Sequence, residues 1–173
     1  MAKLTLTITL HMSELLYDVE NKTYLAGRSK DSGDNYEGVS YSQASDAEAE
    51  RNQILRSIGN AYQTLLNEVS EWLNGTKTTS SDTLQPESDI VVTLLMPSNY
   101  RSTVIDVISS SMHQFIVNTA IADWYMLTDK EDSADHLTLA ATNLNQLKSA
   151  INKRLRPSRP VYSTGLGATH NNS

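Results

Sequence analysis

The sequence predicts a mainly helical α+β fold with a long antiparallel helical hairpin, two further helices, a small two-stranded sheet and an extended C-terminal tail. Three observations support this prediction. Two short segments have the residue pattern of strands, four longer segments repeat apolar residues at helical spacing, and the last stretch has no period. Because 173 residues can enclose one sizeable core, we expect a single helical-bundle domain over residues 1–156 and a basic, polar tail over 157–173.

The two expected strands lie near residues 3–11 and 89–96. The first alternates apolar and polar residues with period two, which is typical of a strand with one buried face. The second, DIVVTLLM, is more continuously apolar, so we expect it to be more buried, and Pro97 ends it. Two strands form only a marginal sheet, and their open edges present unpaired N–H and C=O groups. We therefore expect the sheet to continue in a neighbouring chain.

Two helices are expected between these strands. The first covers residues 13–28, where apolar residues recur every three or four positions, and residues 29–44 form a loop. The second begins at Ser45, which forms a capping box with Glu48, and it ends before Gly75. Each helix has one apolar face, which predicts packing against a common core.

The helical hairpin is expected after the second strand. A long helix capped by Ser98 carries an apolar stripe, and Thr128 with Glu131 forms a second capping box that breaks it. A further helix runs to Arg156, because the residue before Pro157 resists the helical conformation. Each helix has about 28 residues and a length of about 40 Å. Matched lengths across a tight break predict antiparallel packing.

No residue pattern indicates an enzyme, and we expect no catalytic, metal-binding or cofactor-binding residue. The absence of cysteine excludes a disulfide scaffold, a thiolate zinc site, an iron–sulfur site and a cysteine nucleophile. The serines at 109–111 lack the G-x-S-x-G turn, and residues 165–167 lack the third glycine of a phosphate-binding loop. The histidines fall on different segments: His11, His113, His136 and His170.

The longest apolar run, at 90–96, is far shorter than the roughly 20 residues that span a bilayer. No continuous apolar segment follows the N-terminus, so we expect no secretory signal and no membrane partner. The protein is expected to be made and kept in a cytoplasm until it is assembled into a larger structure.

Charge is divided unevenly along the chain, whose net charge is −6. Residues 136–173 contain no Asp or Glu, whereas residues 1–135 contain all 20. An acidic body with a basic end suggests an end that docks on a nucleic-acid backbone or on the acidic face of a neighbouring copy. Alternatively, the cations only oppose the dipole of a helix C-terminus. The basic residues in this part are Lys148, Lys153, Arg154, Arg156 and Arg159.

The first strand and the basic C-terminal part together define the expected contact surface. Contacts between two different surfaces of one chain close into rings when the rotation allows it. The residues expected to contact another subunit or partner are Leu4, Leu6, Ile8, Lys153, Arg154, Arg156, Arg159 and Tyr162.

Three stretches of the chain resemble proteins of a known class. They are SELLYDVENKTYLAGRS, DAEAERNQILRSIGNAYQTLLNEVSEWL and FIVNTAIADWYMLTDKEDSADHLTLAATNLNQLKSAINKRLRPSRP. The third combines W-Y-x-L-T, a short acidic turn, a helix of A-x-x-L-x-x-L repeats and R-x-R-P. These stretches resemble neck proteins of tailed bacteriophages, in particular the ring (adaptor, head–tail connector) proteins of crAss-like phages that infect gut Bacteroidetes. None of them is a catalytic motif.

The resemblance implies a non-enzymatic structural protein of the virion, made in the host cytoplasm and placed in the neck or tail, commonly in a twelve-fold ring around the DNA channel. The implied partners are other copies of the chain, the portal and other neck and tail proteins. Genomic DNA would pass without sequence-specific binding. An acidic body would suit a channel wall that does not grip DNA, because phosphate contacts dominate such binding.

Two other functions stay open. A small nucleic-acid-binding helical protein would use the basic C-terminal part, and neutralising its cations would lower the affinity for DNA. An enzyme with a site between the helices would instead show a deep pocket with convergent titratable groups.

Overall fold

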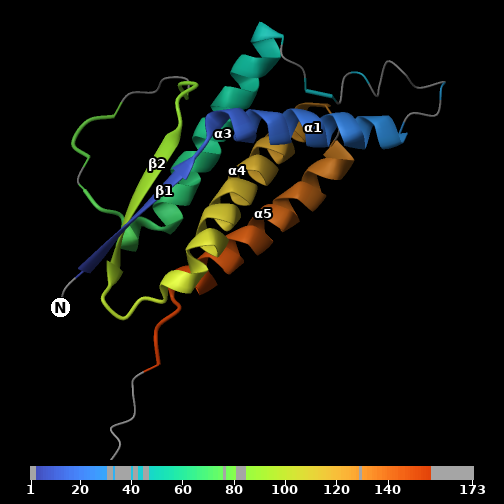
Figure 1. The fold of residues 1–173 in the computed structure, drawn as a ribbon. Helices are drawn as coiled ribbons and strands as arrows, with labels where there is room; N and C mark the ends of the chain where they lie inside the picture. The colour runs from blue at the N-terminus through green and yellow to red at the C-terminus, as the bar shows by residue number, and fades with distance from the viewer. Residues whose placement is uncertain are drawn as a thin grey trace, which may run out of the picture.

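The structure is a computed structural model that describes residues 3–30, 33, 40, 43–44, 47–75, 77–80, 85–128 and 130–156. It confirms the mainly helical α+β fold, with four helices and a two-stranded antiparallel sheet in the described chain (Figure 1). The elements in chain order are β1 (Lys3–Leu10), α1 (Met12–Lys30), α3 (Glu48–Glu68), β2 (Ile90–Pro97), α4 (Ile105–Thr128) and α5 (Lys130–Ile151). The tail predicted over 157–173 lies outside the described residues, so a domain boundary there stays a prediction.

The two strands pair along their whole length, from Lys3 opposite Pro97 to Leu10 opposite Ile90. Threonines of β1 are exposed and the alternate residues from Leu6 onward are buried, as the period-two pattern predicted, whereas Leu4 at the start of the strand is exposed. In β2 the residues between the buried ones are half-buried except Val91, so this strand is covered more completely than β1. The side chains that enter the core from the sheet are Leu6, Ile8, Leu10, Ile90, Val92, Leu94 and Met96.

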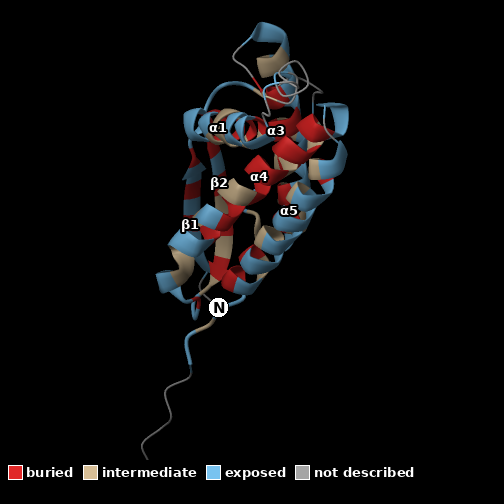
Figure 2. Ribbon diagram, turned by 90° about the vertical axis from the view of Figure 1, so that its right-hand side faces the viewer, coloured by how far each residue is buried: buried red, intermediate tan, exposed pale blue. Residues whose placement is uncertain are grey.

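The central element of the fold is α4, which contacts α1, α3, α5 and β1. Figure 2 shows the buried residues concentrated along α4 and on the parts of its neighbours that turn toward it. A helix that is covered from several sides needs apolar residues on several sides, and α4 has them. Its largest buried side chains are Ile108, Met112, Phe115, Ile116, Ile121, Trp124 and Tyr125. Within the described ranges, no helix combines the length and the apolar character needed to cross a membrane.

The last two helices form the predicted antiparallel hairpin, with its break between Thr128 and Lys130. Small residues on α5 let the two helices approach closely, and the hydroxyl of Ser133 donates a hydrogen bond of 3.0 Å to the carbonyl of Ala122. The buried ridge of α5 is narrow and consists of Ser133, Ala140, Leu147, Ala150 and Ile151.

The outer ends of the hairpin differ from the prediction. The helix expected from Ser98 begins at Ile105, because the chain after β2 first makes a tight turn in which the Tyr100 N–H donates to the Pro97 carbonyl at 2.9 Å. A 3₁₀ turn, Ser102–Val104, follows. The two helices therefore have 24 and 22 residues rather than about 28.

The helix expected to reach Arg156 ends at Ile151. Residues 152–156 leave the helix and run beside the turn after β2. There the Leu155 N–H donates to the Asn99 carbonyl at 2.8 Å, and Tyr100 and Arg154 form an antiparallel bridge. Pairing with a distant segment, rather than Pro157, therefore ends this helix.

The first two helices also shift at their ends. The first runs from Met12 to Lys30, longer than the predicted 13–28. The second begins at Glu48, while Ser45 of the predicted capping box lies outside the described residues. It ends at Glu68 rather than before Gly75, and a 3₁₀ turn, Ser70–Trp72, leads the chain toward the sheet.

Candidate functional site

The first candidate surface is the outer edge of β1. β2 lies between β1 and a short piece of chain after α3, where Leu73 bridges to Leu94 and the Asn74 N–H donates to the Thr93 carbonyl at 2.9 Å. In the part of the chain that the structure describes, no segment pairs with the other edge of β1. That edge therefore presents unpaired backbone N–H and C=O groups.

The side chains expected to make contacts on β1 divide into two groups. Leu6 and Ile8 are only 7% and 3% exposed and belong to the core, because they lie on the face of the sheet that turns toward the helices. Leu4, near the start of the strand, is 47% exposed. Only the backbone of Leu6 and Ile8 can reach a partner in this fold, whereas Leu4 can contribute its side chain.

The second candidate surface is the segment after α5. Arg154 Nη1 donates to the carbonyls of Ile151 and Lys153 at 2.7 Å and 3.1 Å. This cation therefore serves the C-terminus of α5, in agreement with the local role considered from the sequence. By contrast, Lys153 and Arg156 are exposed. Arg159 and Tyr162, also expected to make contacts, lie outside the described residues.

A cation from an earlier turn joins this segment. The Arg101 N–H donates to the Lys153 carbonyl at 3.3 Å, which places the backbone of Arg101 beside the C-terminal segment, and Arg101 Nε donates to the Thr103 hydroxyl at 3.0 Å. No described carboxylate lies within ion-pair distance of these side chains, whereas Lys148 pairs with Glu68 of α3. We call these four residues the basic cluster: Arg101, Lys153, Arg154 and Arg156.

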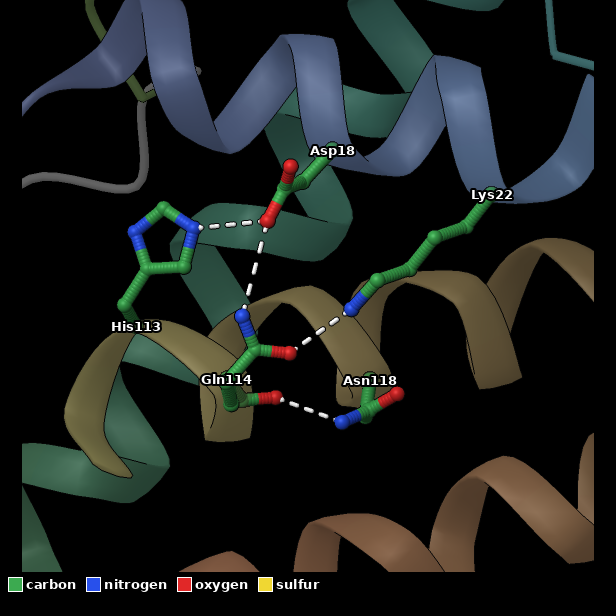
Figure 3. Close-up of polar contacts among 5 residues, drawn as sticks. All are labelled: Asp18, Lys22, His113, Gln114 and Asn118. Atoms are coloured by element: carbon green, nitrogen blue, oxygen red, sulfur yellow. Dashed lines mark hydrogen bonds and ion pairs between the residues drawn. The ribbon is translucent and has the colours of Figure 1, made fainter. Parts of the chain in front are cut away.

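A polar network fastens α1 to α4 (Figure 3). Asp18 Oδ2 accepts hydrogen bonds from His113 Nε2 at 3.1 Å and from Gln114 Nε2 at 3.5 Å. Lys22 Nζ donates to Gln114 Oε1 at 2.7 Å. Burial lowers the pKa of Lys22, and the nearby charge of Asp18 opposes this effect. These side chains use their hydrogen-bonding groups on one another. We therefore interpret the network as a structural contact that holds α1 against α4.

The network continues to α5. Asn118 Nδ2 donates to the Gln114 carbonyl at 2.9 Å, and His136 Nδ1 lies 3.2 Å from Asn118 Oδ1. Burial lowers the pKa of His136 and the charge of Lys22 adds to this, while two nearby aspartates act in the opposite direction. The imidazole also packs against Tyr125, with ring centroids 5.5 Å apart. His136 is therefore a packed, half-buried histidine of the hairpin.

An open groove of about 370 Å³ lies between the junction of β1 with α1 and the first turns of α4. Its two histidines are both engaged: His11 Nδ1 lies 2.8 Å from Asp89 Oδ2, and His113 bonds Asp18. The Met12 N–H also donates to Asp89 at 3.1 Å, and these two hydrogen bonds lower the pKa of Asp89. The residues that line this groove are Thr9, Leu10, His11, Glu14, Asp106, Ser109, Ser110 and His113.

The groove lacks the arrangement that nucleophilic catalysis requires. Among the described residues, neither Ser109 nor Ser110 hydrogen-bonds a histidine, and no group of three or more potential metal ligands is present. His170 lies outside the described residues. What the groove does offer is two carboxylates, Glu14 and Asp106, on different walls.

Sequence reasoning missed Arg101, the groove and the network of Asp18 with His113. The partners are brought together by tertiary pairing across tens of residues, and no local spacing marks them.

Comparison with protein families, with curated proteins and with solved structures finds no match to the chain.

Proposed function

We propose that this protein is a structural subunit of a ring in the neck or tail of a tailed bacteriophage, where it acts as a head–tail connector or adaptor around the DNA channel. Its partners are other copies of itself, in a ring of twelve as the resemblance implies, together with the portal and other neck or tail proteins. It acts in the virion without catalysis, cofactor or sequence-specific DNA binding.

The observation that carries the proposal is the open outer edge of β1. Natural sheets usually protect such edges with charges, prolines, bulges or a covering segment. Here the strand runs straight through Leu4, Leu6 and Ile8, and its one charged residue is Lys3 at the start. A two-stranded sheet is also small for independent stability. Strand addition by another subunit would complete the sheet.

The charge distribution gives a second line of support. The chain has a net charge of −6, yet its basic cluster has no described carboxylate partner. An acidic body disfavours tight contact with passing DNA, while a local cationic surface favours docking on the acidic body of another copy. Both properties suit a subunit that binds other copies of itself and does not hold DNA that passes through the channel.

Native mass spectrometry and negative-stain electron microscopy of the purified full chain test the proposal. We expect rings of defined copy number, and we expect the protein among the components of purified virions. A strictly monomeric protein at every concentration, together with its absence from assembled virions, would overturn the proposal.

A matched pair of variants tests whether the β1 edge is used. Leu4→Lys places a charge at the open strand, and we expect it to lower the oligomeric fraction. Leu139→Lys is the control, because Leu139 on α5 is 50% exposed, close to the 47% of Leu4. Equal effects of both variants would show that general surface charge, and not this edge, controls assembly.

A second candidate function is nucleic-acid binding through the basic cluster. The observation that favours it is the grouping of four cations without described carboxylate partners. Replacing Lys153, Arg154 and Arg156 with Gln should then lower DNA affinity and flatten its salt dependence. The matched control replaces three exposed lysines elsewhere, Lys3, Lys77 and Lys130. Absence of DNA binding at low salt would remove this candidate.

A further inference from the structure

We propose that the groove between β1, α1 and α4 binds the basic cluster of a second copy of this chain, with Lys153 entering the groove between Glu14 and Asp106. The inference rests on the proposed function, because it names the two surfaces that meet when copies assemble. It is carried by the charges and exposure of described residues on both surfaces.

The groove supplies two carboxylates that form no ion pair with a described cation, each in the first turn of a helix. Glu14 comes from α1 and Asp106 from α4, and neither carboxylate has a partner among the described residues. The imidazoles beside them, His11 and His113, are already held by other aspartates. Leu10 and the carbon atoms of the polar side chains also line the groove. Such a groove suits a side chain with an aliphatic stem and a cationic head, which is the chemistry of lysine and arginine.

The segment after α5 presents that chemistry. Lys153 is exposed, and Leu155 two residues later is 55% exposed. In an extended chain, residues two apart project to the same side, so a cation and an apolar side chain face outward together. Arg154 between them is half-buried and bonds its own helix terminus.

The contact forms between copies and not within one chain. Hydrogen bonds to Asn99 and Arg101 fix the backbone of residues 153–155, and in this position Lys153 makes no ion pair with Glu14 or Asp106 of its own chain. Copies with a net charge of −6 repel one another as a whole. A local complementary contact between two different surfaces overcomes this repulsion and permits ring closure.

Zero-length cross-linking tests the inference on the full chain. A carbodiimide activates a carboxylate of Glu14 or Asp106 as an O-acylisourea, and the Lys153 amine then displaces this group to form an amide, while the carbodiimide leaves as its urea. In a mixture of isotope-labelled and unlabelled copies, we expect this amide between differently labelled chains. A link found only within one chain, or no link at any concentration, would overturn the inference.

Charge reversal supplies an independent test. The groove variant, Glu14→Lys with Asp106→Lys, and the cluster variant, Lys153→Glu, should each associate at least about tenfold more weakly than the wild type. Mixing the two variants should restore association, because each then meets a surface of opposite charge. Restoration also shows that both variants are folded.

The control reverses two exposed carboxylates outside the groove, Glu48→Lys and Glu71→Lys. We expect this variant to associate as the wild type does. Rings that persist in both reversal variants would overturn the inference and leave the proposed function standing. Binding of DNA that the cluster variant abolishes, with unchanged self-association, would instead assign the cluster to nucleic acid and overturn the inference.

Discussion

Asp89 shows how one side chain can hold a junction of the fold. It accepts hydrogen bonds from His11 and from the Met12 N–H, so it ties the start of β2 to the turn between β1 and α1. Both bonds favour the carboxylate, and they lower the pKa of Asp89 in the folded protein. The resulting stabilisation is present above the unfolded pKa of about 3.9 and is lost as pH falls through the folded value.

We therefore expect Asp89→Asn to lower the urea midpoint of unfolding at pH 7, and the difference from the wild type to shrink as pH falls toward 3. Urea titrations followed by circular dichroism measure it. The control is Glu71→Gln at an exposed carboxylate, which should behave as the wild type. A difference that stays constant with pH would show that the charge of Asp89 is not responsible.

Two apolar residues of β1, Ile8 and Leu4, should affect different properties when they are replaced: Ile8 the stability of the fold and Leu4 the assembly of the subunits. Ile8→Ala removes a fully buried side chain and should cost about 2–5 kcal/mol of unfolding free energy. Leu4→Ala should cost less than about 0.5 kcal/mol, because Leu4 is exposed, yet it should weaken assembly. Denaturant unfolding and sedimentation velocity separate the two effects. A large loss of stability in Leu4→Ala would place this residue in the core instead.

Two residues of the basic cluster should have different roles: Arg154 stabilises the fold, and Lys153 serves association. Arg154→Gln should lower stability by about 0.5–1.5 kcal/mol, because Arg154 Nη1 bonds two carbonyls at the end of α5. Lys153→Gln should leave stability unchanged and affect association only. Equal thermal stability of the two variants would contradict the local role assigned to Arg154.

At the scale of whole elements, the contact of α1 with α4 depends on polar as well as apolar groups. Asp18→Ala leaves His113 and Gln114 without their acceptor and should cost about 1–3 kcal/mol. A double-mutant cycle with His113→Ala should give a coupling energy of at least about 0.5 kcal/mol. A cycle that closes additively would mean that the hydrogen bond contributes nothing to the packing of these helices.

Local patterns predicted the type of each element well. The alternation in β1 and the break after Thr128 depend on residues within a few positions, and the structure has both where they were expected. The capping box itself is not observed among the described residues, because the Thr128 hydroxyl donates to the Trp124 carbonyl at 3.1 Å. The outer ends of the two hairpin helices were predicted wrongly, because they depend on contacts between residues far apart in the sequence. Bridging of Tyr100 to Arg154 ends α5 at Ile151, across more than 50 residues of chain, and no local signal competes with such pairing.

The candidate surfaces were predicted only in part. The charge division of the sequence drew attention to Lys153 and Arg156, which the structure shows to be exposed, and their contact with a partner stays a prediction. It could not show that Arg101 joins them, because backbone pairing in the folded chain brings Arg101 there. Period-two alternation identified β1, but it could not show that Leu4, on the same face as Leu6, is left exposed at the start of the strand.

For the whole molecule, the two proposed contacts respond differently to salt. Docking of the basic cluster is electrostatic, and the screening length falls from about 10 Å at 0.1 M to about 3 Å at 1 M salt. Strand addition at β1 relies on backbone hydrogen bonds and apolar contact, which salt does not screen.

Raising salt from about 0.1 to about 1 M should therefore convert rings into smaller species held by the β1 edge, rather than directly into monomers. In Leu4→Lys the same titration should end at monomers, because that edge is already impaired. Sedimentation velocity at each salt concentration follows both series. Rings that resist 1 M salt unchanged would mean that the cationic contact adds no measurable stability, and the edge of β1 would then have to account for the whole assembly.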